Sequence, residues 1–133
     1  MLDHLFAAPP RLTDLTADQA MVVRAVRQSI LAQRNRRCCP VQAAAVQLGS
    51  RRASHALHIL LASIGSAWPD PFAVAPPCCP ALTHDESTLL GMVIAARAHG
   101  RPVFDALLCE MLAEDARDRL FAAATALGEL VDA

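Results

Sequence analysis

Two Cys-Cys-Pro tripeptides, at Cys38-Cys39-Pro40 and Cys78-Cys79-Pro80, are the residues of this sequence whose types and spacing best suit chemistry. Proline is tolerated in the first turn of a helix, so each cysteine pair is expected just before a helix begins. A helix start offers unpaired N–H groups and the positive end of the helix dipole, and both stabilise a thiolate. Arg36 and Arg37 add positive charge beside the first pair. The pattern therefore indicates thiols that act as nucleophiles or as metal ligands.

A shared metal site is one hypothesis for these thiols. Zinc sites usually use cysteines with two other residues between them, so each adjacent pair is expected to supply one ligand to a zinc ion or an iron–sulfur cluster. Histidines three residues apart on one side of a helix are suitable ligands to complete the coordination shell. The candidate metal ligands are Cys78, Cys79, Cys38, Cys39, His55 and His58, with His84 as an alternative to either histidine.

Three other hypotheses use the same cysteines. In a redox sensor, one thiol attacks an oxidant and its neighbour resolves the product. Heme ligation by a Cys-Pro dipeptide is not favoured, because a motif of two residues is very unspecific. In the last hypothesis the cysteines only pack, and the prolines set the helix starts. Cys109 lies in an apolar helical pattern and is predicted to be a buried small hydrophobic residue.

The charges are divided unevenly along the chain. Residues 1–52 carry a net charge of about +5 and residues 53–133 about −6, and every basic residue apart from histidine is arginine. This polarity suits a nucleic acid, an acidic partner, head-to-tail self-association, or a match between the two halves of one chain. The basic cluster consists of Arg34, Arg36, Arg37, Arg51 and Arg52.

Nucleic-acid binding is left open but is not favoured. The segments that would read bases, 40–48 and 53–64, are rich in alanine and leucine and lack the side chains that read base edges. The sequence pI of about 6.5 is also far from that of a basic nucleic-acid module. The last predicted helix, with Phe121, Ala122, Ala123, Ala124 and Ala126, is apolar over much of its circumference, so we expect a protein partner and homo-oligomerisation.

The hydrophobic pattern predicts an all-α single domain of five or six helices, forming a bundle or an irregular helical array. Residues 1–14 are expected to form an N-terminal arm and residues 15–133 the helical domain. The predicted helices cover about 17–35, 40–48, 50–64, 83–98, 102–111 and 114–131. Capping boxes at Thr16 and Thr83 mark two starts, and Gly49 and Gly65 mark two ends. Five prolines within 66–82 predict an extended loop, with a short strand-like piece at 72–74.

Within these helices, two faces are assigned from the pattern. Arg27 is expected on the polar side of the first helix, together with Arg24 and Arg34. Val103 and Leu107 mark the apolar pattern of the fifth helix.

Residues 51–90 resemble a family of small uncharacterised alphaproteobacterial helical proteins. Members carry an apolar stretch, then Ala-Pro-Cys-Cys-Cys-Pro, then Met-Thr-x-Asp-Glu and a pair of leucines. Here the chain reads Ala75-Pro-Pro-Cys-Cys-Pro80, then Thr83, Asp85-Glu86 and Leu89-Leu90. Pro77 stands where the family has a third cysteine, and Leu82 stands where it has methionine. The resemblance implies a helical, cytoplasmic protein and transfers no function.

The sequence has no nucleophile elbow, phosphate-binding loop, zinc-protease motif or dinucleotide fingerprint, so an enzyme is not favoured. The absence of a signal-peptide pattern and of an apolar run long enough to span a membrane predicts a cytoplasmic protein. The leading hypothesis is a non-enzymatic regulatory or interaction protein with a metal- or redox-responsive thiol site. The alternatives are a plain adaptor or dimerisation module, and a nucleic-acid-binding regulator that uses the basic cluster.

Overall fold

The part of the chain that the structure describes folds into six α-helices, which confirms the predicted all-α class. A computed structural model describes residues 10–36 and 38–132, and these residues contain no strand. The helices are α2 (Ala17–Asn35), α3 (Pro40–Leu48), α4 (Arg51–Ala67), α5 (His84–Ile94), α6 (Arg101–Leu108) and α7 (Glu114–Gly128). A 3-10 turn at Leu12–Asp14 precedes α2, and a π-helical turn at Ala95–His99 extends α5. Most of the predicted N-terminal arm, residues 1–9, lies outside the described residues.

The helix starts follow the predicted caps. The Thr16 hydroxyl accepts a hydrogen bond from the Gln19 amide at 3.1 Å, and the Thr83 hydroxyl accepts one from the Glu86 amide at 3.0 Å. Both are capping boxes, because the Gln19 and Glu86 side chains accept from the cap amides in return. The sequence therefore specifies the starts of α2 and α5 locally.

Three predicted helix ends are wrong, because the ends expected at 64, 111 and 131 lie at Ala67, Leu108 and Gly128 in the structure. Gly49 does end α3, in the left-handed conformation with φ of 67°. Gly65, however, lies inside α4, which continues to Ala67. The end is set by Pro69, because a proline pushes the preceding residue out of the helical region, and Trp68 is extended.

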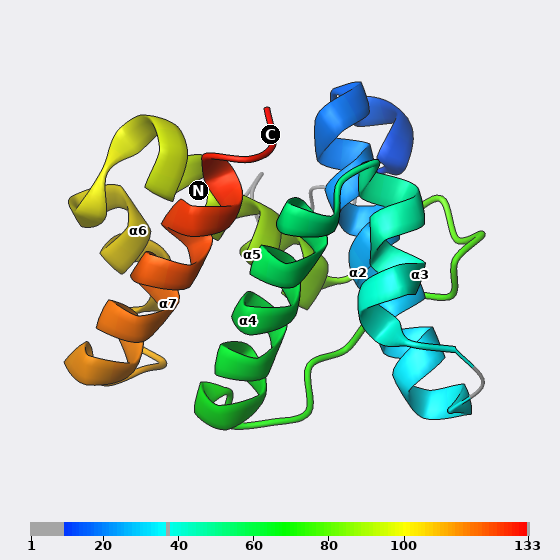
Figure 1. Cartoon of the computed structure of the whole chain (residues 1–133). Coiled ribbons are helices and arrows are strands. Elements are labelled where there is room, and N and C mark those ends of the chain that lie inside the picture. The colour runs from blue at the N-terminus through cyan, green and yellow to red at the C-terminus, as the bar shows by residue number, and fades with distance from the viewer. Residues whose placement is uncertain (1–9, 37, 133) are drawn as a thin grey trace.

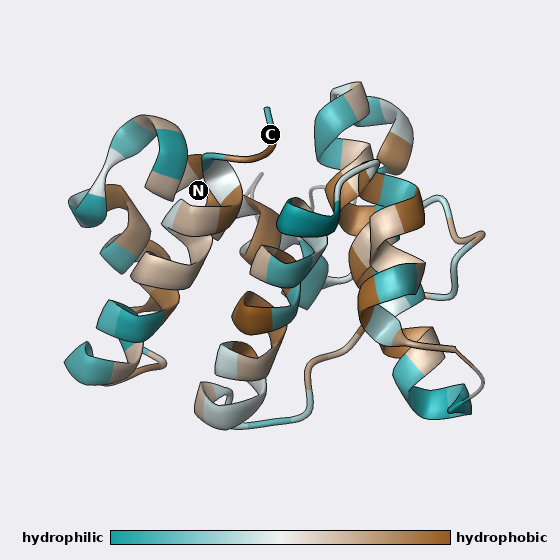
Figure 2. Ribbon diagram, viewed as in Figure 1, coloured by the Kyte–Doolittle hydropathy of each residue, from teal (hydrophilic) through white to brown (hydrophobic). Residues whose placement is uncertain are grey.

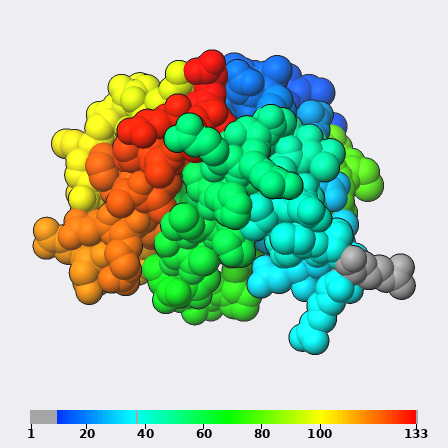
Figure 3. Space-filling view, viewed as in Figure 1, coloured from blue at the N-terminus to red at the C-terminus, as the bar shows by residue number. Residues whose placement is uncertain are grey.

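Helices α7, α4 and α3 lie side by side across the front of the molecule, and α5 lies behind them (Figure 1). Helix α2 packs against α3 at one edge, and α6 packs beside α7 at the other. The space-filling view shows the same order across this face (Figure 3). Apolar residues from all six helices form one core cluster, and polar residues alternate with apolar ones along the outer ribbons (Figure 2). The chain is therefore one domain.

The predicted loop is present and is hydrogen-bonded to α2 through Arg27. Residues 68–83 connect α4 to α5 without helix or strand, so the strand-like piece expected at 72–74 does not form. The nearest approach to a sheet is a single bridge between Arg11 and Ala81. Five prolines explain this, because each removes the N–H that a sheet ladder needs.

The apolar pattern assigned to α6 is on the wrong face. Val103 and Leu107 are exposed, whereas Phe104 and Leu108 are buried. Cys109, predicted to be buried, is also exposed at the C-terminal end of α6. Val103 and Leu107 have the same helical spacing as Phe104 and Leu108. Periodicity alone therefore cannot tell which of the two pairs faces the core. The Phe104 ring sets the inward face of α6, since it packs edge-to-face on Phe121 of α7, with ring centroids 5.1 Å apart.

Two adjacent leucines on α6 test this assignment. We expect Leu108→Ala to lower the free energy of unfolding by about 2–5 kcal/mol, because it leaves a cavity in the core. Leu107→Ala, its matched control one residue earlier, should change stability by only about 0.5 kcal/mol. Urea unfolding of the two variants measures the difference. Equal losses would contradict the inward face assigned here.

An ion-pair cluster fastens α6 to α7. Arg101 donates to Asp105 at 2.8 Å and to Asp118 at 2.6 Å, and Arg117 lies 3.2 Å from Asp105. The Arg101 guanidinium also lies over the Phe121 ring, 5.3 Å from its centroid. The hydrogen bond from Arg101, with the attraction of Arg101 and Arg117, holds the pKa of Asp105 below its ordinary value.

This pKa shift predicts a pH dependence with a defined sign. A carboxyl whose pKa is lower in the folded chain stabilises the fold above its unfolded pKa, and this contribution is lost as pH falls through the folded pKa. NMR titration should place the Asp105 midpoint below the ordinary aspartate value of about 3.9. Arg101→Gln should raise that midpoint. An unchanged midpoint in the variant would show that Arg101 does not cause the shift.

Candidate functional site

Arg27, expected on the polar side of α2, is instead the largest buried side chain of the protein. Only 1% of its surface is exposed, and Glu86 of α5 is 2% exposed. The expectation was wrong because this face of α2 is covered by the loop between α4 and α5. The loop has unpaired carbonyl groups, and a buried arginine can satisfy several of them at once.

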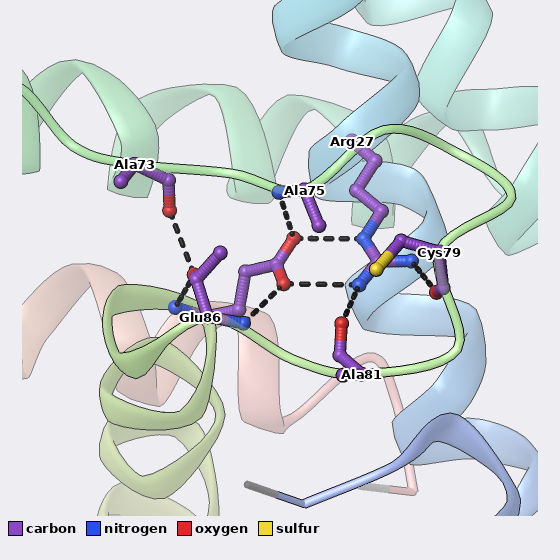
Figure 4. Close-up of polar contacts among 7 residues, drawn as sticks. Arg27, Ala73, Ala75, Cys79, Ala81 and Glu86 are labelled. Atoms are coloured by element: carbon purple, nitrogen blue, oxygen red, sulfur yellow. Dashed lines mark hydrogen bonds and ion pairs between the residues drawn. The ribbon is translucent and has the colours of Figure 1, made fainter.

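The Arg27 guanidinium connects α5 to the cysteine loop (Figure 4). Its Nε donates to Glu86 Oε2 at 2.8 Å and its Nη2 donates to Glu86 Oε1 at 3.0 Å, which makes a bidentate ion pair. Nη1 donates to the carbonyl of Cys79 at 2.7 Å, and Nη2 also donates to the carbonyl of Ala81 at 2.9 Å. One side chain therefore fixes the loop on both sides of Pro80.

Glu86 is held just as completely. Its Oε2 accepts from the Ala75 amide at 3.2 Å, and its Oε1 accepts from the Thr83 amide at 2.8 Å. The Thr83 hydroxyl in turn donates to the carbonyl of Ala73 at 2.8 Å. The hydrogen bond with Glu86 raises the pKa of Arg27 against the opposing effect of burial, and the negative charge of Glu86 raises it further. Arg27 therefore stays charged, and both carboxylate oxygens of Glu86 have hydrogen-bond partners.

Asp85 also holds the same loop through two hydrogen bonds. One carboxylate oxygen accepts from the Trp68 indole N–H at 3.2 Å, and the other accepts from the Ala73 amide at 2.8 Å. Asp85 and Glu86 stand in the first turn of α5, where the helix dipole favours negative charge. In the structure, Asp85 and Glu86 also bind the backbone of the loop.

The two loop cysteines differ in their surroundings. Cys78 is exposed and Cys79 is half-buried. Both backbone groups of Cys79 are in hydrogen bonds, since its N–H donates to the carbonyl of Pro76 at 3.0 Å and its carbonyl accepts from Arg27. The loop thus presents one accessible thiol beside a second whose backbone is fixed.

The N-terminal segment lies along the other side of this loop. The Leu12 amide donates to the carbonyl of Pro80, and the Leu82 amide donates to the carbonyl of Pro10, each at 2.8 Å. These bonds flank the bridge between Arg11 and Ala81. The loop therefore connects the Arg27–Glu86 pair to the beginning of the described chain.

The first cysteine pair lies apart from this network. Cys38 and Cys39 come directly before α3, as predicted, and both are exposed. The same prediction is wrong for Cys78 and Cys79, because α5 begins only at His84. Cys39 is the N-cap residue and has no side-chain hydrogen bond. Cys39 lines a small pocket with Arg51 and His55. His58 lines a different pocket, between α2, α4 and the loop.

These positions bear on the metal hypothesis. In residues 10–36 and 38–132, no three His, Cys, Asp or Glu side chains lie close enough to hold a metal ion. The proposed ligands, among them Cys38, Cys78 and His55, are all within these residues. A zinc ion or an iron–sulfur cluster shared by the two cysteine pairs therefore has no set of three ligands here.

The described arginines of the basic cluster are exposed and do not pair with the acidic half. Arg34, Arg36, Arg51 and Arg52 are exposed and have no ion pair with a residue that the structure describes, and Arg37 is outside the described residues. The only ion pair found there between the two halves is Arg27–Glu86. An intramolecular match of the two halves does not explain the division of charge.

Known proteins offer no guide to this site. The chain matches no protein family, no curated protein and no solved structure. The resemblance noted for residues 51–90 therefore stays an expectation. No described helix is long and apolar enough to cross a membrane.

Removing either member of the buried pair should be costly, because it leaves the other charge unpaired. We expect Arg27→Met and Glu86→Leu to lower the free energy of unfolding, by about 3–5 kcal/mol for Arg27→Met. The double variant Arg27→Met/Glu86→Leu should lose less than the sum of its single changes, because no charge stays buried. Urea unfolding completes the cycle, with exposed Arg34→Met as the control. Additive losses would contradict a coupled pair.

Proposed function

We propose that the protein is a non-enzymatic regulatory protein in which the loop carrying Cys78 and Cys79 is a thiol switch that responds to oxidation. One observation carries the proposal. The exposed Cys78 thiol adjoins Cys79, whose amide and carbonyl are both held by hydrogen bonds, one of them from the buried Arg27. A change in the covalent state of the pair therefore acts directly on a buried charged interaction.

The chemistry uses a low-molecular-weight disulfide as the oxidant. The Cys78 thiolate, having lost its proton to solvent, attacks one sulfur of glutathione disulfide and forms a mixed disulfide. The sulfur–sulfur bond of the oxidant breaks, and one glutathione thiolate leaves with the electron pair. The Cys79 thiolate then attacks the Cys78 sulfur and releases the second glutathione. The protein pair is oxidised and the oxidant is reduced to two thiols.

The product is a ring that contains the Cys78–Cys79 peptide bond. Closing this ring requires the peptide to depart from its relaxed geometry, because disulfides demand specific distances and dihedral angles. The peptide's N–H is bonded to Pro76, and the next carbonyl is bonded to Arg27. Ring closure therefore works against both bonds, and the Arg27–Glu86 pair favours the reduced loop.

The N-terminal segment is the part of the chain that changes when oxidation displaces the loop. Pro80 and Leu82, which follow the cysteine pair directly, hold the segment around Arg11 through two backbone hydrogen bonds. A loop displaced from Arg27 loses this alignment and releases the segment. The signal would then be the altered surface that the loop and the segment offer to a protein partner.

A comparison of the two Cys-Cys-Pro pairs tests the proposal. Cys38→Ser/Cys39→Ser/Cys109→Ser keeps only the loop pair, and Cys78→Ser/Cys79→Ser/Cys109→Ser keeps only the pair before α3. After glutathione disulfide treatment and mass spectrometry, we expect the loop-pair variant to lose about 1.5–3 kcal/mol of stability, the value of a hydrogen bond to a charged group. The matched variant, which lacks the Arg27 bonds, should lose much less.

Limited proteolysis gives a second readout. Oxidation of the loop-pair variant should speed tryptic cleavage after Arg11, because that residue is freed from Ala81. If the loop pair resists oxidation, or if its oxidation changes neither stability nor cleavage, the thiol switch is wrong. The protein would then be a plain adaptor whose cysteines only pack.

A further inference from the structure

An exposed apolar groove runs between α4 and α7 on the face turned away from α5. Ile59 of α4 is 59% exposed, and Leu130, just beyond α7, is 38% exposed. A solitary exposed apolar residue is ordinary, but these two line a common groove with several alanines. The groove is lined by Arg52, His55, Ala56, Ile59, Ala123, Ala126 and Leu130.

The face formed by α4 and α7 has opposite charges at its two ends, beyond the groove. Helices α4 and α7 are antiparallel neighbours, so the start of one lies near the end of the other (Figure 1). Arg51 and Arg52 begin α4, and Glu114 and Asp115 begin α7. The face formed by α4 and α7 is therefore positive where α4 begins, apolar along the groove and negative where α7 begins. One exposed carboxylate, Glu129, also lies at the positive end.

These end charges lack partners within the chain. Residues 19–69 contain no Asp or Glu, so α3 and α4 cannot neutralise Arg51 and Arg52 locally. Neither arginine, nor Glu114 or Asp115, forms an ion pair with another described residue.

The negative end also includes an arginine, Arg119. The exposed carboxylates of Glu110, Glu114 and Asp115 outnumber it, so this end keeps a net negative charge.

We infer that the α4–α7 face binds a second copy of this chain across a two-fold axis. A two-fold interface brings the same surface of both copies together, so it must be self-complementary. When the second copy lies antiparallel, its negative end faces Arg51 and Arg52, and its positive end faces Glu114 and Asp115. The axis passes near Ile59, the middle residue of α4, so the most exposed apolar side chains of the groove meet at the centre.

The charge pattern favours a second copy over a nucleic acid. A polyanion would be attracted by Arg51 and Arg52 but repelled by Glu114 and Asp115 at the other end of the same face. A copy of this chain matches both ends, and the net charge of −1 gives little overall repulsion between copies. The inference is independent of the thiol switch, because no cysteine lines this groove.

Variants that reverse the charge at one end or the other test the interface. Wild type, Arg51→Glu/Arg52→Glu and Glu114→Arg/Asp115→Arg are compared by light scattering after gel filtration, in reductant and low salt. We expect wild type at twice the chain mass of 14.2 kDa. Each variant alone should have a dissociation constant raised at least about tenfold, because like charges then meet at both ends. Mixing the two variants should restore a dimer, since both ends of the mixed pair are matched.

Two further measurements complete the test. Ile59→Ser should weaken the dimer, whereas Leu107→Ser, at an exposed leucine of α6 outside the groove, should not. Raising salt to about 1 M, where the Debye length falls to about 3 Å, should weaken wild type more than either charge variant. A monomeric wild type, or a failure of the mixed variants to associate, overturns the inference. Binding of a labelled DNA duplex that is lost in Arg51→Glu/Arg52→Glu, with wild type monomeric, would assign the arginines to nucleic acid instead.

Discussion

The buried ion pair between Arg27 and Glu86 is the interaction on which the arrangement of the loop depends. Two charges taken out of water are stable only when their hydrogen bonds are nearly all satisfied. Here that requirement brings the backbone of Ala75, Cys79, Ala81 and Thr83 to the pair. A loop of five prolines, which cannot form its own ladder, thereby acquires a fixed conformation.

The same pair gives the two Cys-Cys-Pro sites different physical settings. Before α3, Cys38 and Cys39 are exposed at a helix start with no buried group holding their backbone. In the loop, Cys79 is held on its carbonyl side by a guanidinium on α2, and the following residues hold the N-terminal segment. Identical tripeptides are therefore expected to differ in what oxidation does to the fold. The proposed thiol switch depends on this difference between the two sites. Self-association through α4 and α7 does not depend on it.

The local signals of the sequence predicted much of the fold. Capping at Thr16 and Thr83, the proline at the start of α3 and the glycine at its end each act within a few residues, so the bounds of α2 and α3 follow from the chain itself. The inward face of α6 could not be chosen, because Val103 and Leu107 repeat with the same period as Phe104 and Leu108. The sequence predicted Arg27 on the polar side of α2 because its partner, Glu86, is 59 residues away. The absence of any carboxylate in residues 19–69 was the available sign that an arginine there needs a distant partner.

The most direct test of the central claim is the equilibrium oxidation of the Cys78–Cys79 pair in a glutathione redox buffer, in wild type and in Arg27→Lys. Lysine keeps the positive charge but cannot make the four hydrogen bonds of the guanidinium. If Arg27 holds the loop in its reduced conformation, the variant should be oxidised more readily, with the equilibrium shifted by roughly tenfold or more, as a charged hydrogen bond of about 1.5–3 kcal/mol requires. The Cys38–Cys39 pair in the same chain should not shift. Equal oxidation of the loop pair in both proteins would contradict the coupling between the buried ion pair and the thiols.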